Sequence, residues 1–173
     1  MSNLYLVTGP AGVGKSSISE TMASRLKKSA VIEGDTIYNQ IVGGYIPAWK
    51  EGNHLELFWE LSIINIQFYL DKGIDVVFNY IFNKGALEKI VNNINCDNIK
   101  FIVLMTDEKT LLKRDSERPE DCQMKDRCVT LLNSFKQKGF GEKFILDTTN
   151  LNINQSVDSI LKDNRFIIRQ GEN

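Results

Sequence analysis

Residues 9–16 read Gly-Pro-Ala-Gly-Val-Gly-Lys-Ser and match the pattern G-x-x-x-x-G-K-[ST] at every fixed position. A random chain of this length should contain such a match on the order of one time in a hundred. The pattern constrains the fold strongly, because it functions as a loop between a buried strand and the N-terminus of a helix.

The flanking residues supply this context. Residues 4–8 form a near-continuous apolar run that ends at Gly9 and Pro10, as expected for a strand buried on both faces of a parallel sheet. Between residues 15 and 28, Ile18, Met22 and Leu26 recur every four positions, which predicts a helix. The sequence therefore predicts a strand, a glycine loop and a helix, in that order.

The residue types in this loop suit phosphate. Glycines let backbone N–H groups curl around phosphate oxygens, and the helix N-terminus adds unpaired donors and a positive dipole end. Lys15 supplies a full charge for the β- and γ-phosphates, and the Ser16 hydroxyl is a ligand for Mg²⁺. We therefore predict a site for a nucleoside triphosphate with Mg²⁺, whose loop residues are Gly9, Pro10, Ala11, Gly12, Val13, Gly14, Lys15, Ser16 and Ser17.

Strand and helix patterns alternate along the rest of the chain. Further strands are predicted at residues 30–32, 75–82, 100–105 and 143–146. Helices are predicted at residues 36–42, 55–70, 86–94, 106–116, 120–138 and 156–162, and residues 150–155 read as a polar loop. This alternation predicts an α/β three-layer sandwich around a five-stranded parallel sheet, with residues 1–173 forming one domain.

The composition excludes several classes of function. Lys plus Arg (21) nearly equals Asp plus Glu (22), so the chain lacks the net positive field of a protein that binds nucleic acid or anionic membranes. Cys96, Cys122 and Cys128 show no C-x-x-C spacing, and no basic leader precedes the first strand. With no apolar run long enough to cross a membrane, we expect a cytoplasmic protein with reduced thiols, either a monomer or a homodimer.

With the glycine loop near its N-terminus, a Gly-Asp pair ending the second strand, and arginines between strands four and five, the chain resembles the small P-loop kinases. This group includes gluconate kinase, shikimate kinase, adenylate kinase and chloramphenicol phosphotransferase, and the likeness covers essentially the whole chain. In detail the chain looks most similar to uncharacterised bacterial proteins labelled gluconate-kinase-like or AAA-type ATPases, and to the tunicamycin-resistance type. The resemblance implies the P-loop NTP hydrolase fold of the nucleotide-kinase type, with ATP and Mg²⁺ bound under an arginine-bearing lid.

The resemblance directs attention to acidic residues at the strand ends. In these kinases the second strand ends in an acidic group that faces the acceptor hydroxyl, and Glu33-Gly34-Asp35 occupies that place. Asp35 is the candidate base and acceptor ligand, although it can equally cap the following helix. Glu33 and Asp35 are candidate Mg²⁺ ligands. The family's acidic residue at the end of the third strand is replaced by Asn79, which predicts either a heavier role for Glu33 and Asp35 or weak turnover. Asn79 is also a candidate acceptor ligand.

The lid is placed at about residues 114–127. Arg114 and Arg118, four residues apart, are predicted to share a helical face and to contact the nucleotide or the transition state, and Arg127 follows as a candidate acceptor ligand. The neighbouring acidic residues leave open a solvated, salt-bridged surface. Thr149 and Asn150 follow the fifth strand, where relatives pass a loop around adenine.

The segment at about residues 36–58 is the candidate acceptor-binding region. Tyr45 and Trp49 are either walls of its pocket or core residues, and Trp59 is expected in the core. The leading hypothesis is an enzyme that transfers the γ-phosphoryl group of Mg-ATP to a hydroxyl of a small molecule. The alternative is a nucleotide-binding regulator or slow ATPase without such an acceptor. A polynucleotide kinase is disfavoured, because no basic and aromatic stripe suited to single strands is evident.

Overall fold

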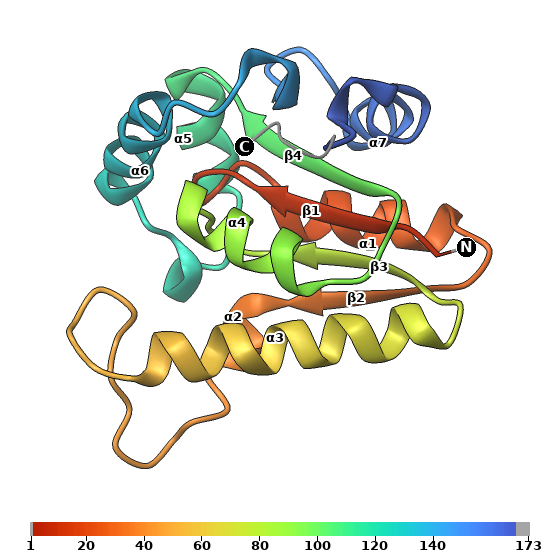
Figure 1. The fold of residues 1–173 in the computed structure, drawn as a ribbon. Coiled ribbons are helices and arrows are strands. Elements are labelled where there is room, and N and C mark those ends of the chain that lie inside the picture. The colour runs from red at the N-terminus through yellow and green to blue at the C-terminus, as the bar shows by residue number, and fades with distance from the viewer. Residues whose placement is uncertain (1, 169–173) are drawn as a thin grey trace.

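The computed structural model describes residues 2–168, and its centre is a five-stranded sheet in which every pairing is parallel. The strands are β1 (Leu4–Thr8), β2 (Ser29–Glu33), β3 (Asp75–Asn79), β4 (Ile99–Met105) and β5 (Ile145–Asp147), in the spatial order β2-β3-β1-β4-β5 (Figure 1). The α/β fold predicted from the sequence is confirmed. Because β1 lies at the centre, the glycine loop that follows it emerges in the middle of the carboxyl edge of the sheet.

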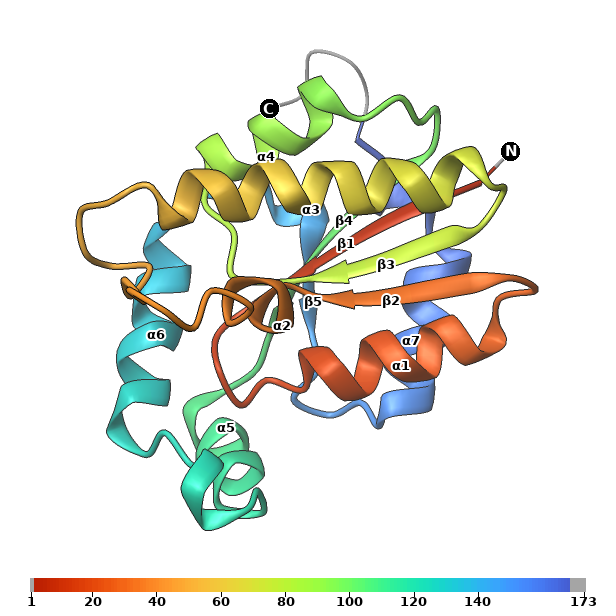
Figure 2. The ribbon, with the colours of Figure 1, turned by 90° about the horizontal axis from the view of Figure 1, so that it is seen from below.

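Helices cover both faces of the sheet. These are α1 (Lys15–Arg25), α2 (Gly34–Tyr38), α3 (His54–Asp71), α4 (Lys84–Asn93), α5 (Glu108–Ser116), α6 (Asp126–Gln137) and α7 (Ile153–Lys162). Figure 2 shows α3 and α4 on one side of the sheet and α1 and α7 on the other, which gives three layers. No helix within residues 2–168 combines the length and the apolar character that crossing a bilayer requires.

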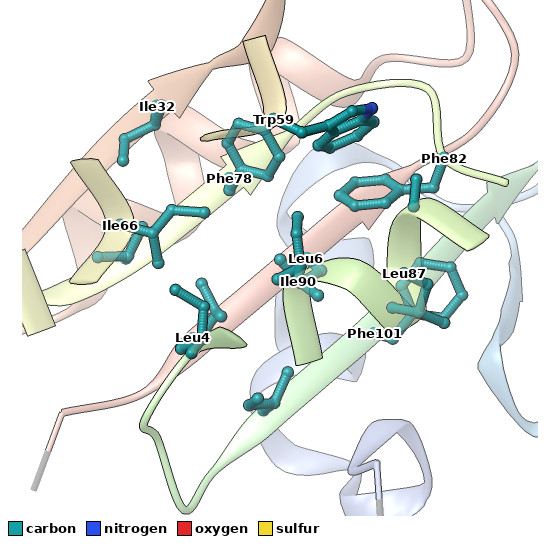
Figure 3. Close-up of a cluster of buried hydrophobic side chains, with 14 of the residues drawn as sticks. Leu4, Leu6, Ile32, Trp59, Ile66, Phe78, Phe82, Leu87, Ile90 and Phe101 are labelled. Carbon is teal, nitrogen blue, oxygen red and sulfur yellow. The ribbon is translucent and has the colours of Figure 1, made fainter. Parts of the chain in front are cut away.

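Alternation along β1 divides the core into two layers. Leu4 and Leu6 face the α3 and α4 side, whereas Tyr5 and Val7 face α1 and α7, and all four are buried. The layer beneath α3 and α4 is rich in aromatic rings, with Trp59, Phe78, Phe82 and Phe101 closely packed (Figure 3). Trp59 is therefore a core residue, as predicted.

Several predicted boundaries were wrong. The helix predicted at 120–138 is split into a 3₁₀ turn (Glu120–Cys122) and α6, because the Asp115 carboxylate accepts the backbone N–H groups of Met124 and Lys125 and Lys125 adopts a φ of 48°. The helix predicted at 36–42 is instead α2, which starts two residues earlier. The polar loop at 150–155 contains the start of α7, since Asn152 and Gln155 form a reciprocal capping box.

The last strand was also misplaced. Residues 142–144 form a 3₁₀ turn rather than the beginning of a strand, so β5 starts at Ile145. The third strand ends at Asn79, three residues short of its predicted end, because the chain leaves the sheet at Tyr80. These shifts keep the order of elements and leave all five carboxyl strand ends at one edge of the sheet.

Candidate nucleotide and phosphoryl-transfer site

The glycine loop follows β1 directly and leads into α1. Gly9 must be glycine for steric reasons, since a Cβ atom there would lie 2.5 Å from the Leu104 carbonyl oxygen on the neighbouring strand. Gly14 caps α1 with a φ of 101°, and a Cβ atom there would meet no atom within 4 Å. The loop is thus packed against β4 at its start and open at the helix N-terminus, where a phosphate would accept hydrogen bonds from backbone N–H groups.

Lys15 lies across this loop. Its Nζ atom donates hydrogen bonds to the carbonyl oxygens of Gly9 and Pro10, both at 3.0 Å. Burial lowers the pKa of Lys15 to about 8, while the negative charges of Asp35 and Glu33 oppose that shift. The Lys15 ammonium group therefore donates to two backbone carbonyl oxygens of the loop and is under the influence of two negative charges.

The ends of β2 and β3 bring three of the predicted residues together. Glu33 and Asn79 are paired in the parallel register, and the Asn79 side-chain amide donates to Glu33 Oε1 at 3.5 Å. Asp35 lies exposed in the first turn of α2, which has no side-chain cap, so the alternative that Asp35 caps this helix does not hold. Glu33 and Asp35 thus lie at the carboxyl edge of the sheet, and both charges act on the Lys15 ammonium.

The Tyr80 side chain packs against the turn that carries Asp35. Its ring lies against Gly34, where a Cβ atom would be 2.5 Å from Tyr80 Cδ2, and it packs on Phe58 with a ring-centroid distance of 4.5 Å. Burial raises the pKa of the Tyr80 phenol well above its usual value, and the charge of Asp35 adds to the shift. The glycine between the two acidic residues is explained by this ring, which the sequence alone did not reveal.

The residues present fit a nucleotide with its metal ion. Phosphate would find open backbone donors and an ammonium group, and Mg²⁺ would find hard oxygen ligands in the exposed Ser16 hydroxyl and the Asp35 carboxylate. Within the described part of the chain, no group of three or more His, Cys, Asp or Glu side chains could hold a metal ion. Any Mg²⁺ here would therefore depend on phosphate oxygens for part of its coordination.

Arg114 ties the glycine loop to the segment after β5. Its Nη1 atom donates to the Val13 carbonyl oxygen at 3.2 Å and to Thr148 Oγ1 at 2.9 Å, and Nη2 donates to the Thr148 carbonyl oxygen at 2.8 Å. Thr149 is also engaged, because its hydroxyl donates to Asp147 and accepts the N–H of Asp107. Arg114 therefore lies beside the loop that would hold the phosphates, in a fixed orientation.

Arg118 does not share a helical face with Arg114, because α5 ends at Ser116. It turns back and donates to Asp115 Oδ1 at 3.2 Å. Because Asp115 in turn lies against Gly12, this bond holds Arg118 near the phosphate loop, where its positive charge contributes to the lowered pKa of Lys15. The predicted contact of Arg118 with the nucleotide or the transition state stays a prediction, while the shared helical face was wrong.

Asp115 is a residue whose importance the sequence analysis missed. It is 2% exposed, and its carboxylate accepts hydrogen bonds from the backbone of residues 124 and 125 and from Arg118. Burial opposes ionisation, but these hydrogen bonds outweigh it and lower the pKa of Asp115. Asp115 and Cys128 also lie against Gly12, whose hypothetical Cβ would be 3.4 Å from Cys128 Sγ, so the base of the lid packs directly on the glycine loop.

The predicted acceptor segment and the lid meet at one contact. The guanidinium carbon of Arg127, near the start of α6, lies 5.1 Å from the centroid of the Trp49 ring, which is 71% exposed. Trp49 belongs to the loop of residues 39–53 between α2 and α3, here called the acceptor loop. This loop projects from the body of the molecule in Figure 1 and passes beside α6 in Figure 2. Tyr45, on the same loop, packs edge-on against Tyr38 at 5.9 Å.

Two cavities lie away from the glycine loop, and the first is lined in part by α6. One of about 400 Å³ has an apolar floor that includes Val103 and Phe135, and a polar rim at Thr106, Asp107 and Asp147. The second, of about 350 Å³, lies between α4 and residues 139–144. Neither is lined by the glycine loop, Glu33 or Asp35.

Comparison with known proteins rests on structure alone, since no family model and no curated protein sequence matches this chain. An unliganded sugar kinase from Janibacter sp. HTCC2649 superposes with a TM-score of 0.72 at 14% identity, covering 93% of each chain. A gluconokinase from Sinorhizobium meliloti 1021 gives 0.66 at 16% identity, covering 92% of this chain and 91% of its own. The tunicamycin resistance protein of Deinococcus radiodurans gives 0.64 at 19% identity, covering 92% and 94%.

The chain has the fold of the small P-loop kinases. Identities below 20% show this shared fold and leave the acceptor open. The P-loop kinase fold also occurs in a Pnkp1/Rnl/Hen1 RNA repair complex, where 80% of this chain matches 46% of the other at a TM-score of 0.60 and 17% identity. The fold is therefore shared by proteins whose described roles range from sugar phosphorylation to RNA repair.

Proposed function

We propose that this protein is an ATP-dependent phosphotransferase that moves the γ-phosphoryl group of Mg-ATP to a hydroxyl of a small molecule. The observation that carries the proposal is the place of Lys15, Glu33 and Asp35, which all follow or end parallel strands at one carboxyl edge of the sheet, where the charges of both carboxylates act on the Lys15 ammonium. A protein that only binds a nucleotide as a regulator needs the phosphate-binding loop alone. Transfer to a hydroxyl also needs a group that accepts the hydroxyl proton, and a carboxylate near the loop can do this.

In this proposal each group has a defined task. The acceptor hydroxyl oxygen forms a bond to the γ-phosphorus while the bond to the β–γ bridging oxygen breaks, and ADP leaves with that electron pair. Asp35 accepts the hydroxyl proton, and Lys15 neutralises charge on the β- and γ-phosphates. Mg²⁺, held by Ser16 with Glu33 or Asp35 nearby, would supply charge neutralisation at the same oxygens.

The lid and the acceptor loop complete the site. We assign residues 114–127 as the lid and residues 36–58 as the acceptor-binding segment, with Tyr45, Trp49 and Arg127 around the acceptor. Arg114 would stand beside the nucleotide together with Thr149 and Asn150, and Arg118 would face the transferring phosphoryl group. Asn79 would act indirectly, by orienting Glu33 through its amide.

The test is ADP release from Mg-ATP with and without a panel of small hydroxyl compounds, for wild type, Lys15→Ala and Asp35→Asn. Stimulation by one compound, lost in both variants, with a phosphate gained by that compound in mass spectrometry, is the expected result. A 5′-hydroxyl oligonucleotide belongs in the panel, because the fold is shared with an RNA repair complex. Stimulation by that oligonucleotide alone would replace the small-molecule acceptor with a polynucleotide.

A second candidate is a nucleotide-binding regulator with slow turnover. It is favoured by Asn79, which stands where the resemblance places an acidic residue. The Asn79 amide donates a hydrogen bond to Glu33 and cannot supply a negative charge to a metal ion. Acceptor-independent ADP release, equal in wild type and Asp35→Asn, would support it. For either function we propose a cytoplasmic protein, consistent with the free thiols of Cys96, Cys122 and Cys128.

A further inference from the structure

The cavity of about 400 Å³ at the ends of β4 and β5, here called the β4–β5 pocket, has no task in the proposed phosphoryl transfer. Five apolar side chains line it, among them Met105 and Phe135, and Asp107, Asp147 and Lys136 bring charges to it. Its volume lies in the range of ligand-binding pockets, which typically combine apolar walls with a few polar groups. The pocket is therefore a candidate site for a second small molecule.

The β4–β5 pocket lies on the other face of the sheet from the predicted nucleotide contacts. Val103 and Ile145 line the pocket and pack in the layer beneath α3 and α4. The glycine loop and α5 pack instead in the layer of α1 and α7, through Val13 and Leu111. Figure 2 shows these two layers on opposite sides of the strands. The pocket is therefore separate from the predicted nucleotide site.

The pocket is also too far from Asp35 to hold the phosphoryl acceptor. In the strand order β2-β3-β1-β4-β5, three strand spacings separate β4 from β2, which Asp35 follows in the chain. At about 4.8 Å per spacing this separation is roughly 14 Å, and β5 lies one spacing further away. A base takes a proton only at a hydrogen-bond distance of about 3 Å. A ligand in the pocket is thus not the molecule that the proposed reaction phosphorylates.

Two carboxylates lie where the strands end at the pocket. The Thr149 hydroxyl donates to Asp147 Oδ1 at 2.6 Å and accepts the N–H of Asp107 at 2.9 Å, so one side chain bridges both residues. Neither carboxylate forms an ion pair within residues 2–168, and Asp147 Oδ2 accepts no hydrogen bond there. The pocket therefore offers negative charge that no side chain of the described part of the chain pairs.

The cations nearby are engaged elsewhere. Arg114 lies close enough for both carboxylates to act on it, but its Nη1 and Nη2 atoms donate to Val13 and Thr148. Lys136 belongs to the last turn of α6, where its charge suits the negative end of the helix dipole, and it is exposed. The two aspartates are thus the charged groups that a ligand would find available.

We propose that the β4–β5 pocket binds a small apolar amine, whose ammonium group lies at Asp107 and Asp147 and whose apolar body packs on Phe135 and Phe140. Hydrogen bonds between an ammonium and a carboxylate are stronger than neutral ones. Thr149 already holds Asp147, so binding orders little at that end. An anion would meet two like charges, and an uncharged molecule would leave both carboxylates unpaired.

Methyl NMR of the methionines tests the proposal, with 2-phenylethylamine as the probe. Met105 lines the pocket, whereas Met22 is buried in the opposite layer, so titration should shift the Met105 signal and leave Met22 in place. A probe of this size should bind with a dissociation constant on the order of 1 mM. Phenylacetate, of similar size but opposite charge, should bind at least about tenfold more weakly.

Charge-removing variants test which groups hold the ammonium. Asp147→Asn keeps an oxygen for Thr149, and Asp107→Asn keeps the oxygen that caps α5, so both should fold. Each should raise the dissociation constant of the probe at least about tenfold. Asp158→Asn is the matched control, because Asp158 is 52% exposed on α7. Lys136→Met should bind the probe no more weakly than wild type.

The same titration separates this pocket from the phosphotransferase site. Lys15→Ala should bind the probe as wild type does, and saturating Mg-ATP should not displace it. The proposal is overturned by displacement with Mg-ATP, by phenylacetate binding as tightly as the amine, by unchanged affinity in both aspartate variants, or by a Met105 signal that shows no saturable shift. None of these outcomes depends on whether the protein transfers phosphate.

Discussion

Replacing Gly34 with alanine should be disproportionately harmful for so small a change. The new Cβ atom would lie 2.5, 2.7 and 2.8 Å from Cδ2, Cγ and Cβ of Tyr80, whereas carbon atoms in contact are normally about 3.5–4.0 Å apart. The Tyr80 ring cannot simply rotate away, because Phe58 and Trp59 pack against it with ring-centroid distances of 4.5 and 5.5 Å. Either the ring or the turn that carries Asp35 must move.

The magnitude follows from two opposing effects. Overpacking a well-packed site costs about 1–3 kcal/mol, and three close contacts against a held ring place this site at the upper end. Alanine is intrinsically better than glycine in a helix by up to about 1 kcal/mol, which offsets part of the cost. We expect Gly34→Ala to reduce the free energy of unfolding by about 2 kcal/mol.

A double-mutant cycle measured by urea denaturation isolates the clash. Tyr80→Gly removes all three close atoms, so Gly34→Ala in that background should be neutral or slightly stabilising, with a coupling energy of about 2 kcal/mol. Gly85→Ala is the matched control, because Gly85 also lies in the first turn of a helix and a Cβ atom there would meet only Asn83 Oδ1, at 3.7 Å. The control should stabilise by up to about 1 kcal/mol.

The reasoning would be refuted by a Gly34→Ala cost that is the same with and without the Tyr80 ring. A functional readout adds to the test, because the substitution displaces the turn that carries Asp35 but leaves the P-loop in place. Acceptor-stimulated ADP release should therefore fall more than tenfold while the dissociation constant for ATP changes little.

Four further predictions concern the proposed lid, the phosphate loop and the acceptor loop. Asp115→Asn removes the charge that accepts the backbone N–H groups of residues 124 and 125, so the free energy of unfolding should fall by about 3 kcal/mol in urea denaturation, with faster hydrogen exchange in residues 117–125. Because burial holds the pKa of Lys15 near 8, against 10.5 for a free lysine, ATP should bind with proton uptake near pH 8; calorimetry in buffers of different ionisation enthalpy should detect this in wild type and not in Lys15→Met. The same shift means that the unfolded chain holds more protons between pH 8 and 10.5, so the contribution of Lys15 to stability rises with pH in that window. Trp49→Ala should raise the acceptor KM while changing the melting temperature by only a few degrees, because Trp49 is exposed and its contact with Arg127 is worth about 1 kcal/mol or less.

The fold was predictable because its signals are local and periodic. The apolar run before the glycine loop, the helical spacing after it and the repeated alternation of strands and helices determine a parallel sheet with two covered faces. The boundary errors came from side chains that act on distant backbone. Asp115 reshapes residues 124 and 125, and no periodic pattern announces that effect.

The candidate site was predictable where a residue's position follows from its place at a strand end. Glu33 and Asn79 come together because β2 and β3 are parallel and in register. The hydrogen bonds of Arg114 were not predictable from the sequence, because their acceptors lie on two loops that are far from Arg114 in the chain. An acidic residue between two arginines suggests a surface salt bridge, and only the fold shows that Asp115 is buried beneath the lid.

The proposed lid is attached at two points of very different strength, and this difference predicts how it would open. At its base, the buried Asp115 carboxylate fixes residues 124 and 125 and packs against the glycine loop. Towards α6, the Arg127 guanidinium lies over the exposed ring of Trp49, a contact worth about 1 kcal/mol or less in water. Thermal energy therefore breaks the outer contact often and the inner one rarely, so we expect the acceptor loop and α6 to separate while the hinge at Asp115 stays intact. Because the hinge also touches Gly12, a lid that moved through Asp115 would disturb the phosphate loop, whereas one that parts at Trp49 can admit an acceptor with the nucleotide still held.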